Sequence, residues 1–318
     1  MRCKKCKQTA CFQIRRHNAA FCEEHFVEHL QNQVVRAIKK YRMFPQGEKI
    51  LLAVSGGKDS LALWDMLVDR GYSVDGLYID LGIPEYSDVS GQKTRNFAEA
   101  RGLVLHEVSL SRAYGVDIGH IARKTRRPSC SVCGVLKRYV MNMVAERHGY
   151  FAVATGHNLD DEAAVLMGNV LNWQTEYLQR QSPLLEAKPG MARKVKPLFR
   201  LAERETAAYC VLRGIDYIMH ECPKSEGATS FTHKELLNRL EAESPGSKDN
   251  FLLGFLRTAP QLFPQVSSDD GPELQQCTWC GQLTTAGECG FCRQLARAGL
   301  NSLALFDSSA PPERNEQN

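Results

Sequence analysis

A glycine-rich segment between an apolar strand and a helical pattern constrains the fold of this chain most strongly. The predicted strand at 50–54 (ILLAV) is followed by Ser-Gly-Gly-Lys-Asp-Ser at 55–60 and by a helical pattern from 61 to 68. Two glycines allow close backbone approach to a ligand, and free N–H groups at a helix start favour an anion. Leu52 stands where a Walker loop has its first glycine, so the segment predicts a different kind of phosphate loop. A tight turn without a ligand is the simpler alternative.

Strands and helical patterns alternate along the centre of the chain. Apolar strands are predicted at 74–79, 103–108 and 151–155, and each follows a stretch compatible with a helix. This alternation predicts an α/β fold with a doubly wound, mainly parallel sheet that helices cover on both faces. Such sheets bind ligands beyond the carboxyl ends of their strands, where the strand order reverses. The segment at 55–60 follows such an end.

Length and composition exclude several classes of protein. The 318 residues are 43% hydrophobic and 24% charged, which is typical of a globular chain with one large domain and small modules. No apolar run approaches the roughly 18 residues of a membrane span, and the first residues lack the apolar stretch of a secretion signal. We therefore expect a cytoplasmic protein with no membrane partner.

Positive charge is concentrated near the N-terminus. Residues 1–49 contain 11 Lys and Arg against 4 Asp and Glu, whereas the remaining residues contain 29 against 32. A second basic stretch lies at 123–127, and a basic helix is predicted over 25–41. Local positive patches on a near-neutral body suit a nucleic-acid partner, although solvated surface charge is an equal alternative.

Twelve cysteines suggest metal binding at both ends of the chain. Near the N-terminus, Cys3 and Cys6 are separated by two residues, as are Cys22 and His25. Two such pairs can wrap one tetrahedral ion, and metal binding would supply the folding free energy that a segment with few aliphatic residues lacks. We predict a zinc finger over residues 1–27. The alternative is a redox-active pair beside unrelated residues.

The C-terminal cysteines have the same paired spacing. A four-cysteine zinc finger is predicted over residues 273–296, and two disulfides are the weaker alternative in a reducing compartment. Its ligands would be Cys277, Cys280, Cys289 and Cys292.

Three further motifs identify a family. Cys130 and Cys133 precede Lys137, Gly156–Asp161 follow the strand at 151–155, and Cys222 precedes a proline. Together with the segment at 55–60 and the terminal modules, this order resembles the tRNA 2-thiouridine synthetases, the TtcA/TtuA family of N-type (PP-loop) ATP pyrophosphatases. The similarity extends from Cys3 to about Cys292, which is nearly the whole chain.

The resemblance implies the residues of an active site. Cys130, Cys133 and Cys222 would hold a [4Fe–4S] cluster, in which three thiolates leave one iron without a protein ligand. Lys137 and Asp161 would act beside them, Asp161 in proton transfer or in magnesium binding. ATP with magnesium would contact the loop and the strand ends around it: Ala53, Val54, Ser55, Gly56, Gly57, Lys58, Asp59, Ser60, Ile79, Gly156 and Asp161.

Simpler interpretations remain for these residues. The pair Cys130 and Cys133 could carry a persulfide or exchange disulfides without a cluster, and the acidic run at 160–162 could merely begin a helix. Cys210 is expected in the core, and Cys11 has no predicted function.

The resemblance also implies a reaction. ATP would adenylate the C2 oxygen of a uridine or 5-methyluridine in tRNA, most simply at position 54, and sulfur would then replace that oxygen. The alternatives are thiolation at wobble uridine 34 or cytidine 32, a thiolase without a cluster, lysidine synthesis, and a zinc-finger RNA-binding protein without catalysis. The family further implies a ubiquitin-like thiocarboxylated sulfur carrier and a homodimer.

The domain organisation follows from these motifs. The PP-loop catalytic domain is predicted over 28–225, beginning with the basic helix, and a helical extension over 226–265. A linker is predicted from Pro260 to Pro272, and the polar tail at 305–318 is expected to be disordered.

Overall fold

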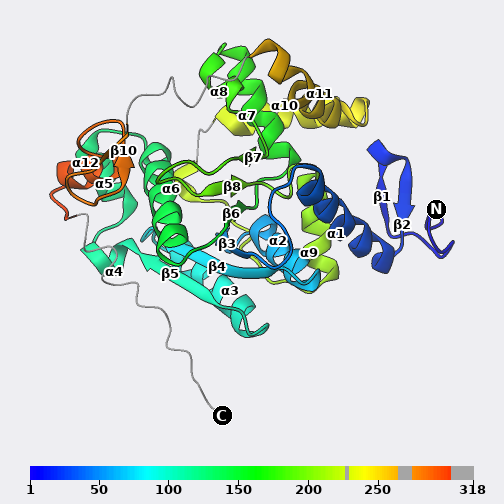
Figure 1. Ribbon diagram of the computed structural model, residues 1–318. Helices are drawn as coiled ribbons and strands as arrows, with labels where there is room; N and C mark the ends of the chain where they lie inside the picture. Colours follow the sequence, from blue (N-terminus) through cyan, green and yellow to red (C-terminus); the bar gives the residue numbers. More distant parts are fainter. Residues whose placement is uncertain (226–228, 264–273, 302–318) are drawn as a thin grey trace.

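The computed structural model describes residues 1–225, 229–263 and 274–301 (Figure 1). At its centre lies a six-stranded sheet with the order β5-β4-β3-β6-β8-β7, in which only β7 runs antiparallel to its neighbour. This confirms the predicted mainly parallel sheet; the short strands β7 and β8 were not predicted. The strands are β3 (Lys49–Val54), β4 (Ser73–Asp80), β5 (Leu105–Ser109), β6 (Ala152–Thr155), β7 (Leu184–Leu185) and β8 (Arg193–Val195).

Helices cover both faces of the sheet. Alternate residues of a strand point to opposite faces, so Ile50 and Leu52 pack with α1, α2 and α9, whereas Leu51 packs with α5 and α6. All three side chains are fully buried, and each such burial contributes about 1.5–3 kcal/mol. These helices are α1 (Glu23–Lys40), α2 (Lys58–Asp69), α5 (Ile118–Thr125), α6 (Ser129–Arg147) and α9 (Glu203–Leu212).

Gly76 lets α2 pack tightly on the sheet. A Cβ atom built on this glycine of β4 would lie 2.3 Å from the ring of Trp64, which belongs to α2 and is fully buried. The indole N–H of Trp64 donates to the carbonyl of Val74 at 3.2 Å, so this large side chain is both enclosed and satisfied. The contact fixes the height of α2 above the sheet, and α2 begins in the predicted phosphate loop.

The strand order reverses between β3 and β6. From β3 the chain moves outward through β4 and β5, then returns to β6 on the other side of β3. Loops that leave these two adjacent strands in opposite directions open a crevice at their carboxyl ends. The segments at 55–60 and 156–161 both lie there, as the sequence predicted.

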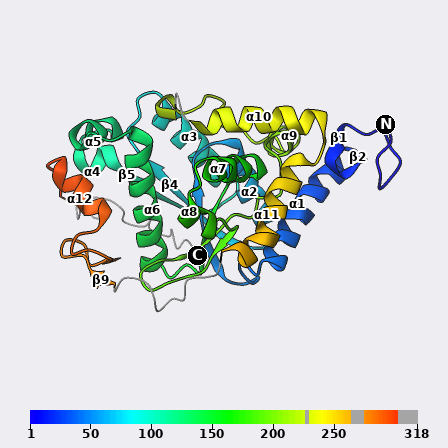
Figure 2. The same ribbon diagram turned by 90° about the horizontal axis from the view of Figure 1, so that it is seen from above.

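Two small modules lie at opposite ends of the molecule in both views (Figures 1 and 2). The N-terminal module contains the hairpin β1 (Phe12–Ile14) and β2 (Ala19–Phe21) with a short 3-10 turn, Arg15–His17, between them. The C-terminal module contains β9 (Gln275–Gln276), β10 (Leu283–Thr284) and α12 (Gly290–Arg297), and it packs on α5 and α6.

The predicted basic helix is α1, which connects the N-terminal module to the sheet. The remaining helices of the body are α3 (Tyr86–Glu99), α4 (Leu110–Tyr114), α7 (Leu159–Leu171) and α8 (Thr175–Gln179). No helix among the described residues is long and apolar enough to cross a membrane.

The helical extension consists of α10 (Thr229–Glu243) and α11 (Ser247–Leu262). The predicted start of the linker at Pro260 is wrong, because α11 continues through Pro260 to Leu262. A proline there removes one backbone N–H only two residues before the helix ends, so little of the helix depends on it. The rest of that linker and the tail at 305–318 lie outside the described residues.

Candidate active site

A cavity of about 480 Å³ opens at the carboxyl ends of β3, β4 and β6. All five predicted catalytic residues line it: Cys130, Cys133, Lys137, Asp161 and Cys222. Of the predicted nucleotide-binding residues, only Gly56 and Lys58 do not. Those that do are Ala53, Val54, Ser55, Gly57, Asp59, Ser60, Ile79, Gly156 and Asp161.

The loop at 55–60 has its own hydrogen bonds. The Ser60 hydroxyl donates to the Gly57 carbonyl at 3.0 Å and accepts from the Ser55 N–H at 3.2 Å. Gly57 is the N-cap of α2 and provides no side-chain cap, so the first N–H groups of this helix face the crevice without a side-chain acceptor. A helix start of this kind binds phosphate oxygens.

Gly56 and Gly156 make room for close approaches of the backbone. Gly56 has a positive φ of 72°, and a Cβ atom there would lie 2.4 Å from the Ser90 carbonyl oxygen of α3. A Cβ atom on Gly156 would lie 2.9 Å from the Ser60 backbone nitrogen. The two glycines therefore hold the loop between α3 and the end of β6.

Asp59 ties three segments together. Its Oδ1 accepts hydrogen bonds from Asn158 Nδ2 at 3.1 Å and from the Thr206 hydroxyl, and its Oδ2 lies 3.1 Å from Lys58 Nζ. Burial raises the pKa of Asp59, and Asp161 raises it further, while Lys58 and the hydrogen bonds oppose this shift. Asp59 and Asp161 both line the cavity, and carboxylate oxygens are ligands that a divalent cation takes.

The three cysteines enter the cavity from two distant segments. Cys130 and Cys133 lie one turn apart in the first turns of α6, and Lys137 follows one turn later on the same face. Cys222 precedes the 3-10 turn Pro223–Ser225, and the Cys130 thiol donates to the Lys224 carbonyl at 3.2 Å. The structure therefore brings together cysteines separated by some ninety residues, which spacing alone did not predict.

The groups around Cys133 shift the pKa of its thiol in both directions. Burial raises the pKa of this thiol, Lys137 lowers it, and the neighbouring Cys130 and Cys222 raise it further. These three cysteines are not among the described groups whose ligand atoms all lie within 4.8 Å of one another. At least two of their sulfurs therefore lie more than 4.8 Å apart.

The remaining wall of the cavity is mostly apolar, and motif analysis did not identify it. Leu81, Ile83 and Ile118 line it together with Tyr78 and Tyr86. Burial raises the pKa of Tyr78 to about 12, so its hydroxyl stays protonated and donates to the Ser87 carbonyl at 2.7 Å. Apolar strand ends with a few polar groups give no sequence signal distinct from that of the core.

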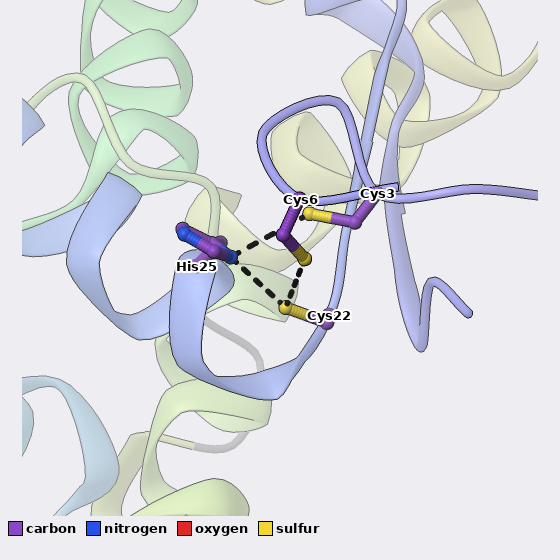
Figure 3. Close-up of side chains that lie close together, drawn as sticks. All are labelled: Cys3, Cys6, Cys22 and His25. Carbon is purple, nitrogen blue, oxygen red and sulfur yellow. Dashed lines mark hydrogen bonds between the residues drawn. The ribbon is translucent and has the colours of Figure 1, made fainter. Parts of the chain in front are cut away.

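The N-terminal module brings together its four predicted ligands (Figure 3). Cys6 Sγ lies 3.7 Å from Cys22 Sγ, and His25 Nδ1 lies 3.7 Å from Cys3 Sγ and 3.1 Å from Cys22 Sγ. A tetrahedral zinc with bonds of about 2.3 Å to sulfur requires sulfur–sulfur edges of about 3.8 Å. The arrangement is a four-ligand metal site.

The C-terminal module forms a second four-ligand metal site. Its four cysteine sulfurs lie within 4.8 Å of one another, and Cys280 Sγ lies 3.8 Å from Cys289 Sγ. Hydrogen bonds from Cys292 lower the pKa of Cys289 to about 5, although burial opposes this shift. None of the twelve cysteines, all of which lie among the described residues, forms a disulfide bond in this structure.

Two cysteines lie outside all of these sites. Cys11 is exposed, and its thiol donates to the Phe21 carbonyl at 3.5 Å. Cys210 is buried behind the loop, as predicted, and its thiol donates to the Lys58 carbonyl at 3.3 Å.

The fold and the site define the class of this protein. The PP-loop domain family matches residues 26–229, which is more than half of the chain, so the chain is a PP-loop protein. The family described as "2-thiouridine synthetase TtuA, N-terminal LIM domain" matches residues 2–27.

Relatives narrow the class to one family. The chain is 49% identical to the tRNA-5-methyluridine(54) 2-sulfurtransferase of Thermus thermophilus, over 92% of this chain and 90% of that protein. It is 41% identical to the protein of the same name from Pyrococcus horikoshii, over 92% and 93%. The chain belongs to the tRNA-5-methyluridine(54) 2-sulfurtransferase family, which confirms the resemblance seen in its motifs.

A solved structure shares the fold. The U34-tRNA thiolase NcsA from Methanococcus maripaludis, solved with its [4Fe–4S] cluster, superimposes with a TM-score of 0.77 and is 24% identical, over 92% of this chain and 95% of that one.

Proposed function

We propose that this chain catalyses ATP-dependent 2-thiolation of 5-methyluridine at position 54 of tRNA. The observation that carries the proposal is that three cysteines and four residues of the Ser55–Ser60 loop line the same cavity. A phosphate loop alone would suit any enzyme of the superfamily, and a cysteine triad alone would suit many metal proteins. The assignment of position 54 rests on the relatives that are 41–49% identical to the chain.

The residues of the loop would bind and orient ATP. The N-terminus of α2 and the serine hydroxyls would hold the phosphates, and Lys58 would add a positive charge. Asp59 and Asp161 would hold the magnesium that accompanies ATP. The apolar wall formed by Leu81, Ile83 and Ile118 would exclude water from the reacting base and nucleotide.

The chemistry then follows in two steps. The C2 oxygen of the base attacks the α-phosphorus of ATP, the bond to the β-phosphate breaks, and pyrophosphate leaves. Lys137, which lines the cavity on the side of the cysteines, would stabilise the negative charge that develops there. A sulfur nucleophile then forms a bond to C2, the C2–oxygen bond breaks, and AMP leaves with that oxygen.

The three cysteines would hold the cluster. All three line one cavity, and cysteine thiolates are the ligands that such a cluster takes, so the donor set fits. A [4Fe–4S] cluster with three protein thiolates supplies an iron at which sulfide can be held. The two four-ligand sites would hold zinc, since their donor sets and edges match tetrahedral zinc.

The partners of the reaction complete the proposal. The sulfur would come from a ubiquitin-like carrier with a C-terminal thiocarboxylate, and the enzyme would act as a homodimer in the cytoplasm. Relatives from eukaryotes that are 28% identical are named cytoplasmic tRNA 2-thiolation protein 1. The metal modules and the basic stretches would contact tRNA, chiefly through its phosphates.

Anaerobic purification followed by iron, sulfide and nucleoside analysis tests the proposal. Wild-type protein should contain a [4Fe–4S] cluster and should convert 5-methyluridine 54 to its 2-thio form when ATP and a sulfide source are present. Fragment mass spectrometry that locates the sulfur at position 34 or 32 would reject the assigned position. Cys222→Ser should lose the cluster and the activity, whereas Cys11→Ser, an exposed cysteine outside the cavity, should keep both.

A further inference from the structure

Lys234 of the helical extension reaches the active site. Its Nζ lies 2.6 Å from Asp161 Oδ1 and 3.1 Å from Glu203 Oε2, and its side chain is 21% exposed. Asp161 lines the cavity, whereas Lys234 does not, so the lysine stands directly behind this carboxylate. No motif in the sequence identified α10 as part of the site.

Lys234 belongs to a network of five charged groups. Three carboxylates, Asp59, Asp161 and Glu203, share two lysines: Glu203 Oε1 binds Lys58 at 2.7 Å, while Glu203 Oε2 binds Lys234. Carboxylates crowded beside a cavity repel one another unless cations separate them. Removing Lys234 would leave the three carboxylates with Lys58 alone. Within this network, Asp161 would then contact no cation.

The carboxylate of Asp161 is held from both sides. Its Oδ2 accepts from the Asn158 backbone N–H at 3.1 Å in the capping box of α7, and its Oδ1 accepts from Lys234. The capping bond fixes one oxygen and the lysine fixes the other, which defines the plane of the carboxylate. A group that meets a magnesium ion or a proton in the cavity needs such a fixed orientation.

Packing of α10 on α7 sets the position of Lys234. Leu237, one turn after Lys234, is buried against Ala163 and Ala164 of α7. The ring of His233 lies over Gly168, where a Cβ atom would come 3.0 Å from Cε1. Small residues on α7 thus let α10 approach closely and set its register against the helix that begins beside Asp161.

We infer that Lys234 is a positioning residue of the active site, which holds the Asp161 carboxylate in its reactive orientation. The inference rests on the proposed function, because it gives Asp161 a role in that reaction. Lys234 does not line the cavity. Its loss should therefore lower the rate of the chemical step more than it weakens nucleotide binding. Its location also makes the helical extension a part of the catalytic unit.

Kinetics of three variants test this inference. Lys234→Met should lower kcat for tRNA thiolation about 10- to 100-fold, in line with the cost of a misplaced catalytic group, with the KM for ATP changed less than about threefold. Lys234→Arg keeps a cation at this position and should recover most of kcat. Arg239→Met is the control: it removes an exposed cation five residues further along α10 and should stay within about twofold of wild type. Thermal unfolding of each variant checks that the fold is kept.

Other outcomes would overturn the inference. A raised KM for ATP with an unchanged kcat would show that Lys234 supports nucleotide binding rather than the chemical step. An Arg variant as slow as the Met variant, or a Met variant as fast as wild type, would show that the cation does not position Asp161. Wild-type protein that thiolates no tRNA would remove the proposed function itself, whereas an active wild type with an unaffected Met variant removes only this inference.

Discussion

Gly156→Ala would place a methyl group against the backbone of the phosphate loop, at the contact between that loop and the end of β6. The new Cβ would lie 2.9 Å from the Ser60 nitrogen, 3.0 Å from the Asp59 carbonyl carbon and 3.0 Å from the Ser60 Cα. All three are backbone atoms in the first turn of α2, so no side chain can rotate away. Relief to an ordinary contact requires the loop and the end of β6 to separate by roughly 0.5 Å, and overpacking of this kind costs about 1–3 kcal/mol of stability.

The functional effect should exceed the effect on stability. Because a 1 Å misplacement costs about 100-fold in rate, a shift of half that size should lower kcat/KM for ATP about 10-fold. The assay is single-turnover thiolation of tRNA over a range of ATP concentrations, with urea unfolding of the same protein. Gly254→Ala is the matched control, because that glycine lies inside α11 and the nearest atom to its added Cβ is the end of the flexible Arg257 side chain, at 3.9 Å. A Gly156→Ala enzyme with wild-type kcat/KM and stability would refute the reasoning.

Three further predictions concern the modules at the two ends. Arg16→Met should lower the free energy of unfolding by about 3–5 kcal/mol, because it leaves buried Glu205 unpaired, and Arg16→Lys should recover part of that loss in urea titrations. Phe291→Ala leaves a cavity at a buried position in the C-terminal module and should lower the free energy of unfolding by about 3–5 kcal/mol in the same titrations. Thr278→Ala is the control, because this exposed residue should leave that free energy almost unchanged. Burial, with Arg16 nearby, lowers the pKa of His17 and of His29 to about 4, so the unfolded chain binds more protons than the folded one between pH 6.5 and 4. Stability should therefore fall as pH drops through that window, and His17→Gln should reduce the slope; an unchanged slope would contradict this account.

The fold was predictable where the sequence has a strong period. The four central strands are apolar runs bounded by turns, and the structure contains all of them, although β5 begins at Leu105 rather than at 103. The strands β7 and β8 have two and three residues, which is too short for any period to be recognised. The linker was wrongly predicted to begin at Pro260, because a proline near the end of a helix lowers the stability of that helix only slightly.

The site was predictable where it is local in sequence. Local spacing predicts residues 55–60, the pair Cys130 and Cys133, and both metal modules, because the geometry of each is set within a few residues of one chain segment. Glu203 and Lys234 could not be found in this way. They reach the site because α9 and α10 pack beside α2 and α7, and single charged residues in a helix look the same whether they face solvent or an active site.

The two metal modules brace opposite walls of the cavity. The stacked rings of Tyr139 and Phe291, 3.7 Å apart, join the C-terminal module to α6, the helix that carries Cys130 and Cys133. At the other end, Arg16 donates two hydrogen bonds to Glu205 of α9, at 2.6 and 2.8 Å, and α9 also supplies the Thr206 hydroxyl that binds Asp59. Each module thus supports a helix whose first turns build the site, one on the side of the cysteines and one on the side of the nucleotide. A metal ion that folds its module would therefore also hold one wall of the cavity in place, which would give these small modules a role in geometry in addition to any contact with tRNA.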